Sequence, residues 1–487
     1  MGSAEVGRQL VVSVINDTIG KLTRKEFPNA LRGINHAANL IKSSLKDLGL
    51  NPADFMMPGT IGDLDMRLPL LDEIERKKFG HLEAGLLLDA ASETFIEGQR
   101  VEREILLDYK KKDINIFGYD SQARGTAESR KMIRSEAEQM GFDQLPADAK
   151  NPVEDVWLTD GGMGALSRTY RALYTMIRNE KGKDGVILSS DVCFPMAINC
   201  AEDHGLKVNL VKTSDMPSQQ INKEAIERYF SEGGHTPDIM LLTPAENPTA
   251  KSHEPENVRD VISFVKEKNP NTVFIFDMAY MSMIPQKRSQ EIMQVIKDTG
   301  VYSQSIFTLS ESKRLAQPGL RVGATIIPEN KALQLAFQND TIRNYSSFGW
   351  KTDVWFQVLN RMVTPRVLED YNLLLRTRQF ALLETLRDID KNHTYFKNLD
   401  QLSVPGFHEE GDGTVEMDNP LYLYIELQDG ISALEHVAKD LGIFGVPGSV
   451  FGDKHNHLRF SLGVTSLEQI LKRSPETMGR LRDKLIA

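Results

Sequence analysis

The sequence predicts an α/β protein with a mostly parallel, seven-stranded sheet and a smaller α+β domain. Three observations predict this class: the 487 residues are many for one domain, short apolar runs alternate with helical patterns over about 150–328, and strands mixed with helices return after about residue 396. Such alternation is typical of parallel strands whose two faces are covered by helices. The runs are Val156–Leu158, Val186–Leu188, Val208–Val211, Ile239–Leu242, Val273–Phe276, Ile306–Leu309 and Ala324–Ile327.

The rest of the chain lies on either side of this sheet in the sequence. The last apolar run follows its neighbour without a helix between them, so we expect one antiparallel strand. In the tail we expect strands over Leu421–Ile425 and Leu458–Leu462 and helices over 431–441 and 467–485. We divide the chain into a helical N-terminal extension (1–56), an N-terminal segment (57–150), a large domain (151–345), long connecting helices (346–395) and a C-terminal small domain (396–487).

Composition excludes several classes of protein. Forty per cent hydrophobic residues are ordinary for a globular protein with a large core. The net charge of −10 disfavours nucleic acid or an anionic membrane as partner, because both require basic patches. The sequence has no run of 18 apolar residues, so we expect no membrane span. The apolar run Leu10–Ile15 is too short for the hydrophobic region of a signal peptide. Cys193 and Cys200 are spaced as on one helical face rather than as a disulfide framework, so we expect a cytoplasmic protein.

The most informative segment is Ser310–Gly323, which follows an apolar run. Lys313 stands one short turn after that run, with Ser310 in front and Arg321 eight residues behind. A lysine amine can form a Schiff base with an aldehyde, and serine and arginine are suitable phosphate ligands. Ser310-x-x-Lys313 also matches the serine motif of penicillin-binding proteins, but the partner motifs Lys-Thr-Gly and Ser-Asp-Asn are absent from the sequence.

A second phosphate candidate is Gly161–Leu166, which follows the first apolar run and opens a helix. Glycines let the backbone approach a phosphate, and a helix N-terminus presents free N–H groups. Gly162-x-Gly164-x-x-Ser167 also approximates the dinucleotide fingerprint, with Asp191 after the next run. That alternative lacks the third glycine and leaves Lys313 unexplained. A plain glycine turn is the simplest interpretation of the segment alone.

Four further residues lie where the predicted strands end. Asp277 closes the run Val273–Phe276, and a carboxylate there can pair with a protonated pyridine nitrogen of a ligand. Tyr280 and Asn247 can hydrogen-bond a phenolic oxygen on the pyridine ring of such a ligand, and Phe194 can stack on that ring. Taken singly, Asp277 is explained as a common helix cap and Asn247 as part of a common turn, and Phe194 is more often a core residue before a turn. Their order and spacing relative to Lys313 favour the ligand-binding interpretation.

This ordered set resembles the fold-type I enzymes that use pyridoxal 5′-phosphate (PLP), the aminotransferase class I/II family, from about residue 57 to the C-terminus. The resemblance implies an aspartate-aminotransferase-like fold and a homodimer, with 57–150 contributing to the small domain and the dimer interface. It implies Lys313 and Tyr280 as catalytic residues. No carboxylate or cysteine ligand set accompanies His455 and His457, so we expect no metal site. The resemblance implies PLP contacts from Tyr119, Gly162, Met163, Phe194, Asn247, Asp277, Tyr280, Ser310, Lys313 and Arg321, and substrate contacts from Gly62, Asn247 and Arg459.

The chain also departs from the family pattern. Met163 stands where many members have serine or threonine, and Ala250 replaces the usual glycine after Asn-Pro-Thr. The extension 1–56 has no assigned role. The Met163 departure removes one expected side-chain bond to the phosphate.

The implied function is an aminotransferase of amino acid metabolism or biosynthesis, which moves an amino group from an amino acid to a 2-oxo acid through a Lys313 Schiff base. The same motifs leave open a PLP-dependent lyase or cyclase, as in 1-aminocyclopropane-1-carboxylate synthase acting on S-adenosylmethionine. A PLP-fold regulator is disfavoured because residues 1–55 show no helix-turn-helix and no basic excess. The identity of the substrate side chain does not follow from the sequence.

Overall fold

The computed structural model describes most of the chain from residue 93 onward. The predictions made for the extension 1–56, Gly62 and Tyr119 lie outside the described residues. The described residues are 93–112, 124–143, 154–314, 318–344, 349–362, 365–407, 415–432, 436–437, 440–441, 443, 445–463, 467–471 and 473–486.

The predicted seven-stranded sheet is confirmed, with strand order β1-β7-β6-β5-β4-β2-β3. The pairs among β2 to β6 are parallel, and β7 is antiparallel to both of its neighbours, as expected from the missing helix before it. The strands are β1 (Val156–Asp160), β2 (Val186–Ser190), β3 (Lys207–Val211), β4 (Ile239–Leu242), β5 (Val273–Asp277), β6 (Ser305–Ser310) and β7 (Val322–Ile326).

Helices cover both faces of this sheet because alternate strand residues point to opposite faces and nearly all are apolar. On β5, Phe274 and Phe276 join one buried cluster and Ile275 joins the other. One face packs against α5 (Ala127–Gln139), α8 (Lys223–Ser231), α9 (Pro255–Lys268) and α10 (Gln286–Asp298). The other face packs against α6 (Gly161–Lys181), α7 (Pro195–Asp203) and α12 (Lys331–Arg343).

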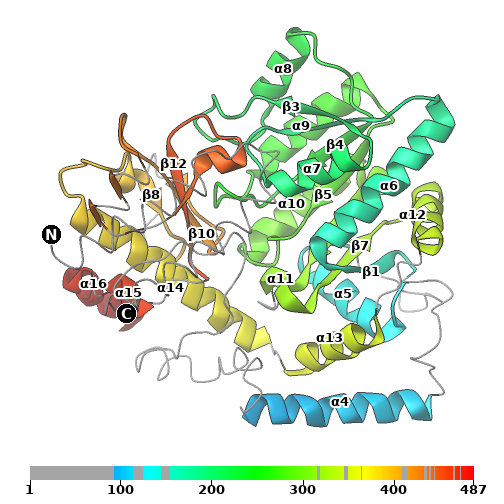
Figure 1. The fold of residues 1–487 in the computed structure, drawn as a ribbon, viewed down its shortest axis with the longest axis horizontal. Helices are drawn as coiled ribbons and strands as arrows, with labels where there is room; N and C mark the ends of the chain where they lie inside the picture. The colour runs from blue at the N-terminus through cyan, green and yellow to red at the C-terminus, as the bar shows by residue number, and fades with distance from the viewer. Residues whose placement is uncertain are drawn as a thin grey trace, which may run out of the picture.

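A smaller sheet lies beside the large one, in the order β10-β12-β11 (Figure 1). Its apolar face packs against the second half of α14, whereas the first half of α14 contributes to a core of the large sheet. The long helix α14 therefore joins the two hydrophobic cores. The elements here are α14 (Pro365–Ile389), β8 (Leu402–Ser403), β9 (Val415–Glu416), β10 (Tyr422–Glu426), β11 (Val446–Pro447), β12 (His457–Ser461), α15 (Leu467–Leu471) and α16 (Pro475–Ile486).

Two further helices pack together at the edge of the molecule, α4 (Glu93–Lys111) and α13 (Trp350–Met362). Between them Tyr109 is buried and donates its hydroxyl to Asp353 at 3.3 Å. Burial, with Asp353 alongside, raises the pKa of Tyr109 to about 12. The same carboxylate accepts a hydrogen bond from Thr126, the N-cap of α5.

Two local expectations were wrong. The helix expected over 467–485 is two helices, because Pro475 cannot continue a helix and instead begins α16. Cys193 precedes α7 rather than sharing a helical face with Cys200, and neither cysteine forms a disulfide.

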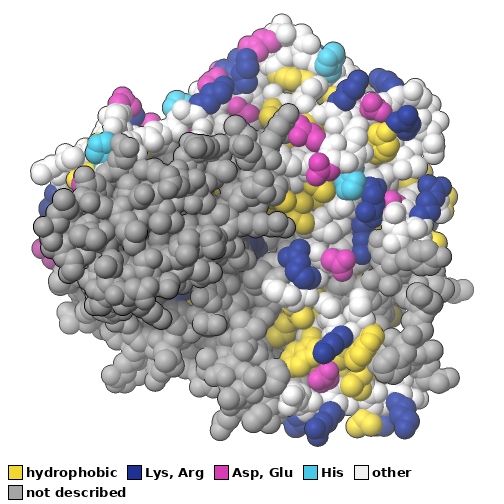
Figure 2. Space-filling view, viewed as in Figure 1, with side chains coloured by type: hydrophobic (Ala, Val, Ile, Leu, Met, Phe, Trp, Pro, Cys, Tyr) yellow, Lys and Arg dark blue, Asp and Glu magenta, His cyan; other side chains and the backbone are white. Residues whose placement is uncertain are grey.

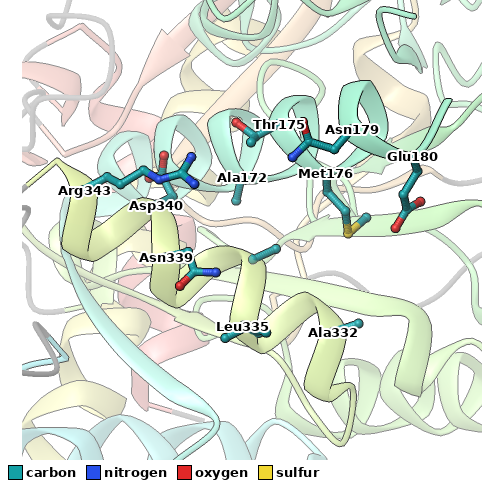
Figure 3. A pocket seen from close by; sticks show the side chains of 11 residues that line it. Ala172, Thr175, Met176, Asn179, Glu180, Ala332, Leu335, Asn339, Asp340 and Arg343 are labelled. Carbon is teal, nitrogen blue, oxygen red and sulfur yellow. The ribbon is translucent and has the colours of Figure 1, made fainter. Parts of the chain in front are cut away.

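The described surface mixes charges of both signs. Figure 2 shows Lys and Arg side chains interspersed with Asp and Glu over the described part of one face. Among the described helices, none is long and apolar enough to cross a membrane. A cavity of about 300 Å³ lies between α6 and α12, lined by Met176, Leu335 and Arg343 among others (Figure 3). This cavity faces the later turns of α6, away from the glycines with which the helix begins.

Candidate active site

The predicted residues of the large domain meet at the carboxyl edge of the parallel strands. Asn247 follows β4, Asp277 is the last residue of β5, and Ser310 is the last residue of β6. Lys313 lies directly after β6 in the short helix α11 (Glu311–Arg314). Because β4, β5 and β6 are neighbours in the sheet, their ends bring these side chains to one place.

The start of α6, Ser310 and Arg321 form a cup in which a side chain at Gly161 or Gly162 would crowd its neighbours. A Cβ added to Gly161 would lie 2.9 Å from Arg321 Nη2, and one added to Gly162 would lie 3.0 Å from Ser310 Cβ. Gly161 also has a φ of +76°, which favours glycine. Arg321 Nη2 donates to Asp160 O at 3.2 Å, which holds the guanidinium beside the helix N-terminus.

Met163 contributes differently from the other residues of the cup. Its side chain packs against the apolar cluster between α6 and the sheet. Met163 lies in the first turn of α6, where its main-chain N–H has no partner within the helix, and the expected loss of a side-chain bond to the phosphate stays a prediction. The positive end of the helix supplies N–H groups in place of a hydroxyl.

Asp277 is a buried carboxylate with weak partners. Its Oδ1 accepts from Ala279 N at 3.2 Å and from Thr308 Oγ1 at 3.4 Å. No described cation lies within ion-pair distance of it. Burial therefore raises the pKa of Asp277 to about 6.

Tyr280 and Asn247 connect Asp277 to the small sheet. Asn247 Nδ2 donates to Tyr280 Oη at 3.2 Å, and Asn247 Oδ1 accepts from Arg459 Nη1 at 2.6 Å. All three side chains are buried. Burial raises the pKa of Tyr280 well above its usual range, and like-charge repulsion from the neighbouring Tyr422 phenol adds to the rise.

Lys313 reaches this group from α11. Its Nζ lies 5.9 Å from the centroid of the Tyr280 ring. The next residue, Arg314, fixes the helix, because its guanidinium is paired with Glu136 at 2.9 Å and Glu311 at 2.8 Å. Burial raises the pKa of Glu136, and the guanidinium opposes that rise. Arg314 thus anchors the segment that presents Lys313.

Phe194 lies at the N-cap of α7, after β2 on the α6 side of the sheet, and is partly buried. The preceding residue is tied to the small domain, because Cys193 N donates to Phe451 O at 3.1 Å.

Arg459 lies in the middle of β12, opposite Tyr424 on β10. The guanidinium carbon lies 4.4 Å from the centroid of the Tyr422 ring and 4.7 Å from that of Phe451. Its Nε and Nη2 have no hydrogen-bond partner within the described part of the chain, although the residue is fully buried. Burial lowers the pKa of Arg459.

The sequence interpretation did not single out Tyr422 or Phe451. A signal for Tyr422 exists: Leu421-Tyr422-Leu423-Tyr424 alternates, so both tyrosines face the same side of β10 as Arg459 does on β12. Nothing in the sequence shows which of them contacts the arginine.

The profile of the family described as aminotransferase class I and II matches residues 147–470. The chain belongs to the class I and II aminotransferase family. It is 25% identical over 290 residues to an LL-diaminopimelate aminotransferase of Protochlamydia amoebophila, covering 58% of this chain and 65% of that protein. It is 26% identical over 225 residues to a histidinol-phosphate aminotransferase of Haloarcula marismortui, covering 45% and 56%. The chain therefore spans less than two thirds of the length of these curated relatives.

Solved structures confirm the aspartate-aminotransferase-like fold. A "probable N-succinyldiaminopimelate aminotransferase" from Thermus thermophilus superposes with a TM-score of 0.61 at 17% identity, covering 93% of this chain and 100% of that one. An aspartate aminotransferase of Thermotoga maritima gives a TM-score of 0.56 at 18% identity, covering 85% and 97%.

This aminotransferase family is PLP-dependent, and the described residues fit that cofactor. Asp277 is a buried carboxylate without a described counter-ion, which suits a protonated pyridine nitrogen. The cup at Gly161 and Gly162 offers main-chain N–H groups, a serine and an arginine where a Cβ would be in the way.

Proposed function

We propose that this class I and II family member is a PLP-dependent aminotransferase that moves an amino group from an amino acid to a 2-oxo acid. One observation carries the proposal. The guanidinium of Arg459, which has two donors without a partner in the described residues, is linked through Asn247 to Tyr280, and the Tyr280 ring lies beside the amine of Lys313. These contacts support the proposal that a carboxylate-binding group and a reactive amine belong to one site.

Several residues would hold the cofactor. Ser310, Arg321 and the first N–H groups of α6 would bind its phosphate, and Asp277 would pair with its pyridine nitrogen. Phe194 would stack on the ring, while Tyr280 and Asn247 would face its phenolic oxygen. In the family's homodimer, Tyr119 of one subunit would add a phosphate contact in the other. When bound, PLP supplies an aldehyde for an amine and an electron sink for the carbanion formed at the substrate Cα.

Lys313 and Arg459 would act on the substrate. Arg459 would bind the α-carboxylate through Nε and Nη2, the two donors that lack a partner among the described residues, in a bidentate pair. This grip orients the substrate so that its Cα–H faces the Lys313 amine. Lys313 Nζ would take that proton and return it, acting as general base and then general acid. Gly62 is proposed to lie over the substrate.

The proposal extends to an amino acid substrate, a homodimer and a cytoplasmic location. The relatives named above carry different substrates in their names, so the proposal stops at the class of amino acids and 2-oxo acids. None of the relatives reported above carries the name of a lyase or cyclase.

The test is a donor panel. The purified protein is incubated with PLP and single amino acids, and pyridoxamine phosphate and the 2-oxo acid are measured by chromatography. We expect at least one donor to yield both products in equal amounts, and the exposed-surface variant Lys287→Ala, whose amine lies on α10, to behave like the wild type. Formation of ammonia and a 2-oxo acid without pyridoxamine phosphate would contradict transamination and support elimination.

A further inference from the structure

Tyr422 contacts both halves of the site described above. Its hydroxyl lies 3.0 Å from Tyr280 Oη, and its ring lies under the guanidinium of Arg459 at 4.4 Å. The side chain is buried, and its main-chain oxygen accepts a hydrogen bond from Gln379 of α14 at 2.8 Å. The residue is thus held rigidly between the two sheets.

The direction of the hydrogen bonds around Tyr280 follows from which groups can donate. A guanidinium only donates, so Asn247 must turn its Oδ1 towards Arg459 and its Nδ2 towards Tyr280. A tyrosine oxygen accepts at most two hydrogen bonds and donates one. Asn247 fills one accepting position on Tyr280. The contact with Tyr422 decides what happens to the Tyr280 proton.

Arg459 favours Tyr422 as the donor in that contact. A positive charge over the ring face stabilises negative charge on the phenol and makes its O–H a stronger donor. The guanidinium stacks on the Tyr422 ring. With Tyr422 donating, both accepting positions of Tyr280 are filled, and the Tyr280 proton must point to a third acceptor.

We propose that Tyr422 is a positioning residue that donates its hydroxyl proton to Tyr280 and thereby directs the Tyr280 proton at the phenolic oxygen of the cofactor. This inference rests on the proposed function. A donor directed at that oxygen stabilises its anionic form. The hydroxyl of Tyr422 therefore lowers the midpoint pH at which the visible absorbance of the bound cofactor changes.

The test is Tyr422→Phe in the cofactor-loaded protein, which removes the hydroxyl and keeps the ring against Arg459. We expect the midpoint pH of the absorbance change to rise by about half to one unit, the size of one hydrogen bond. The KM for a carboxylate substrate should change less than about twofold, because the grip of Arg459 remains. Tyr424→Phe is the matched control: Tyr424 lies on the same face of the same strand, but its hydroxyl donates to Asp453 at 2.6 Å.

A double-mutant cycle separates this role from general damage. In a Tyr280→Phe background, Tyr422→Phe should cause no further shift, because the proton that Tyr422 directs is gone. An unchanged midpoint in Tyr422→Phe, an equal shift in Tyr424→Phe, or a shift that persists without the Tyr280 hydroxyl would each overturn the inference.

Two additions keep the result decisive. If Tyr422→Phe does not fold, 3-fluorotyrosine placed at 422 makes the hydroxyl a stronger donor, so the midpoint should fall; an unchanged or raised midpoint overturns the inference. Borohydride trapping of PLP on wild-type Lys313 shows separately whether the proposed function holds. If PLP is trapped on Lys313 but the Tyr422 variants leave the midpoint pH unchanged, only the inference about Tyr422 is refuted. If PLP is not trapped on Lys313, both the proposed function and the inference are refuted.

Discussion

The seven-stranded sheet and the three-stranded sheet each bring one buried charge to the site, and they do so in different ways. Asp277 stands at the end of β5 and is held by a main-chain N–H and Thr308. Arg459 stands in the middle of β12 and is held between two aromatic rings and Asn247. Neither has an opposite charge within ion-pair distance in the part of the chain that the structure describes.

Several other buried charges are paired with an opposite charge. Arg134 contacts Asp155 at 2.7 Å, and Arg314 contacts Glu136 and Glu311. A buried charge without a partner lowers the stability of the fold, so Asp277 and Arg459 are retained at the expense of stability. The ligands that we propose for Asp277 and Arg459 would supply the missing opposite charges: a cationic ring nitrogen for Asp277 and a carboxylate for Arg459.

The largest effect is expected from Lys313→Ala. This change removes the amine that lies between the part of the site from the seven-stranded sheet and the part from the three-stranded sheet. Loss of the nucleophile and general base should lower kcat by at least about 10⁴-fold. The measurement is pyridoxamine phosphate formation under single-turnover conditions, with circular dichroism to show that the fold is intact. A visible absorbance band typical of lysine-bound cofactor in this variant would contradict the assignment.

Arg459→Lys tests the small-sheet half. The charge is kept, but the planar fork that binds a carboxylate through two N–H groups is lost, so kcat/KM should fall by about 10²–10³-fold. The matched control is Arg134→Lys, a buried arginine already paired with Asp155, for which substrate kinetics should not change. An equal loss in both variants would show that Arg459 has only a structural role.

Asp277→Asn tests the part of the site from the seven-stranded sheet, and the readout is how the stability of the fold depends on pH. The pKa of about 6 in the folded protein lies above the ordinary aspartate value, so the folded state binds the proton more tightly. Stability of the cofactor-free protein therefore falls as pH rises from about 4 to 6, by up to about 3 kcal/mol. Asparagine has no carboxyl group to ionise, so the variant does not lose stability over this pH range.

The variant should accordingly be more stable than wild type at pH 8 by about 2–3 kcal/mol and similar near pH 4, while its activity falls. Urea unfolding of both cofactor-free proteins at the two pH values provides the measurement. A difference that does not depend on pH would show that the Asp277 carboxylate carries no unpaired charge.

The smallest effect is expected from Ala250→Gly, in the loop that joins the two halves after Asn247. Ala250 has a φ of +63°, which glycine adopts with less strain, but its methyl group is fully buried. Relief of strain and loss of the methyl offset each other, so the free energy of unfolding should change by less than about 1 kcal/mol. Thermal unfolding and KM provide the measurement. A large fall in stability or a large rise in KM would mean that this loop requires alanine at position 250.

Much of the fold followed from the sequence because buried parallel strands read as short apolar runs. The meeting of Asn247, Asp277 and Ser310 followed from the same topology, since parallel strands end at one edge. The roles of Tyr422 and Phe451 did not, because their contacts with Arg459 depend on packing between two sheets. The helix expected over 467–485 failed because apolar spacing continues through the break at Pro475. Gly62 and Tyr119 stay predictions.

The hydrogen bond from Cys193 N to Phe451 O has a consequence for how such a protein diversifies. It ties the loop carrying Phe194 to the turn whose aromatic ring packs on Arg459. Both partners are main-chain atoms, so every substitution at these two positions except Cys193→Pro keeps the donor and the acceptor. The distance between the loop of Phe194 and the turn of Phe451 is therefore set by the main chain and depends little on which side chains these two segments carry.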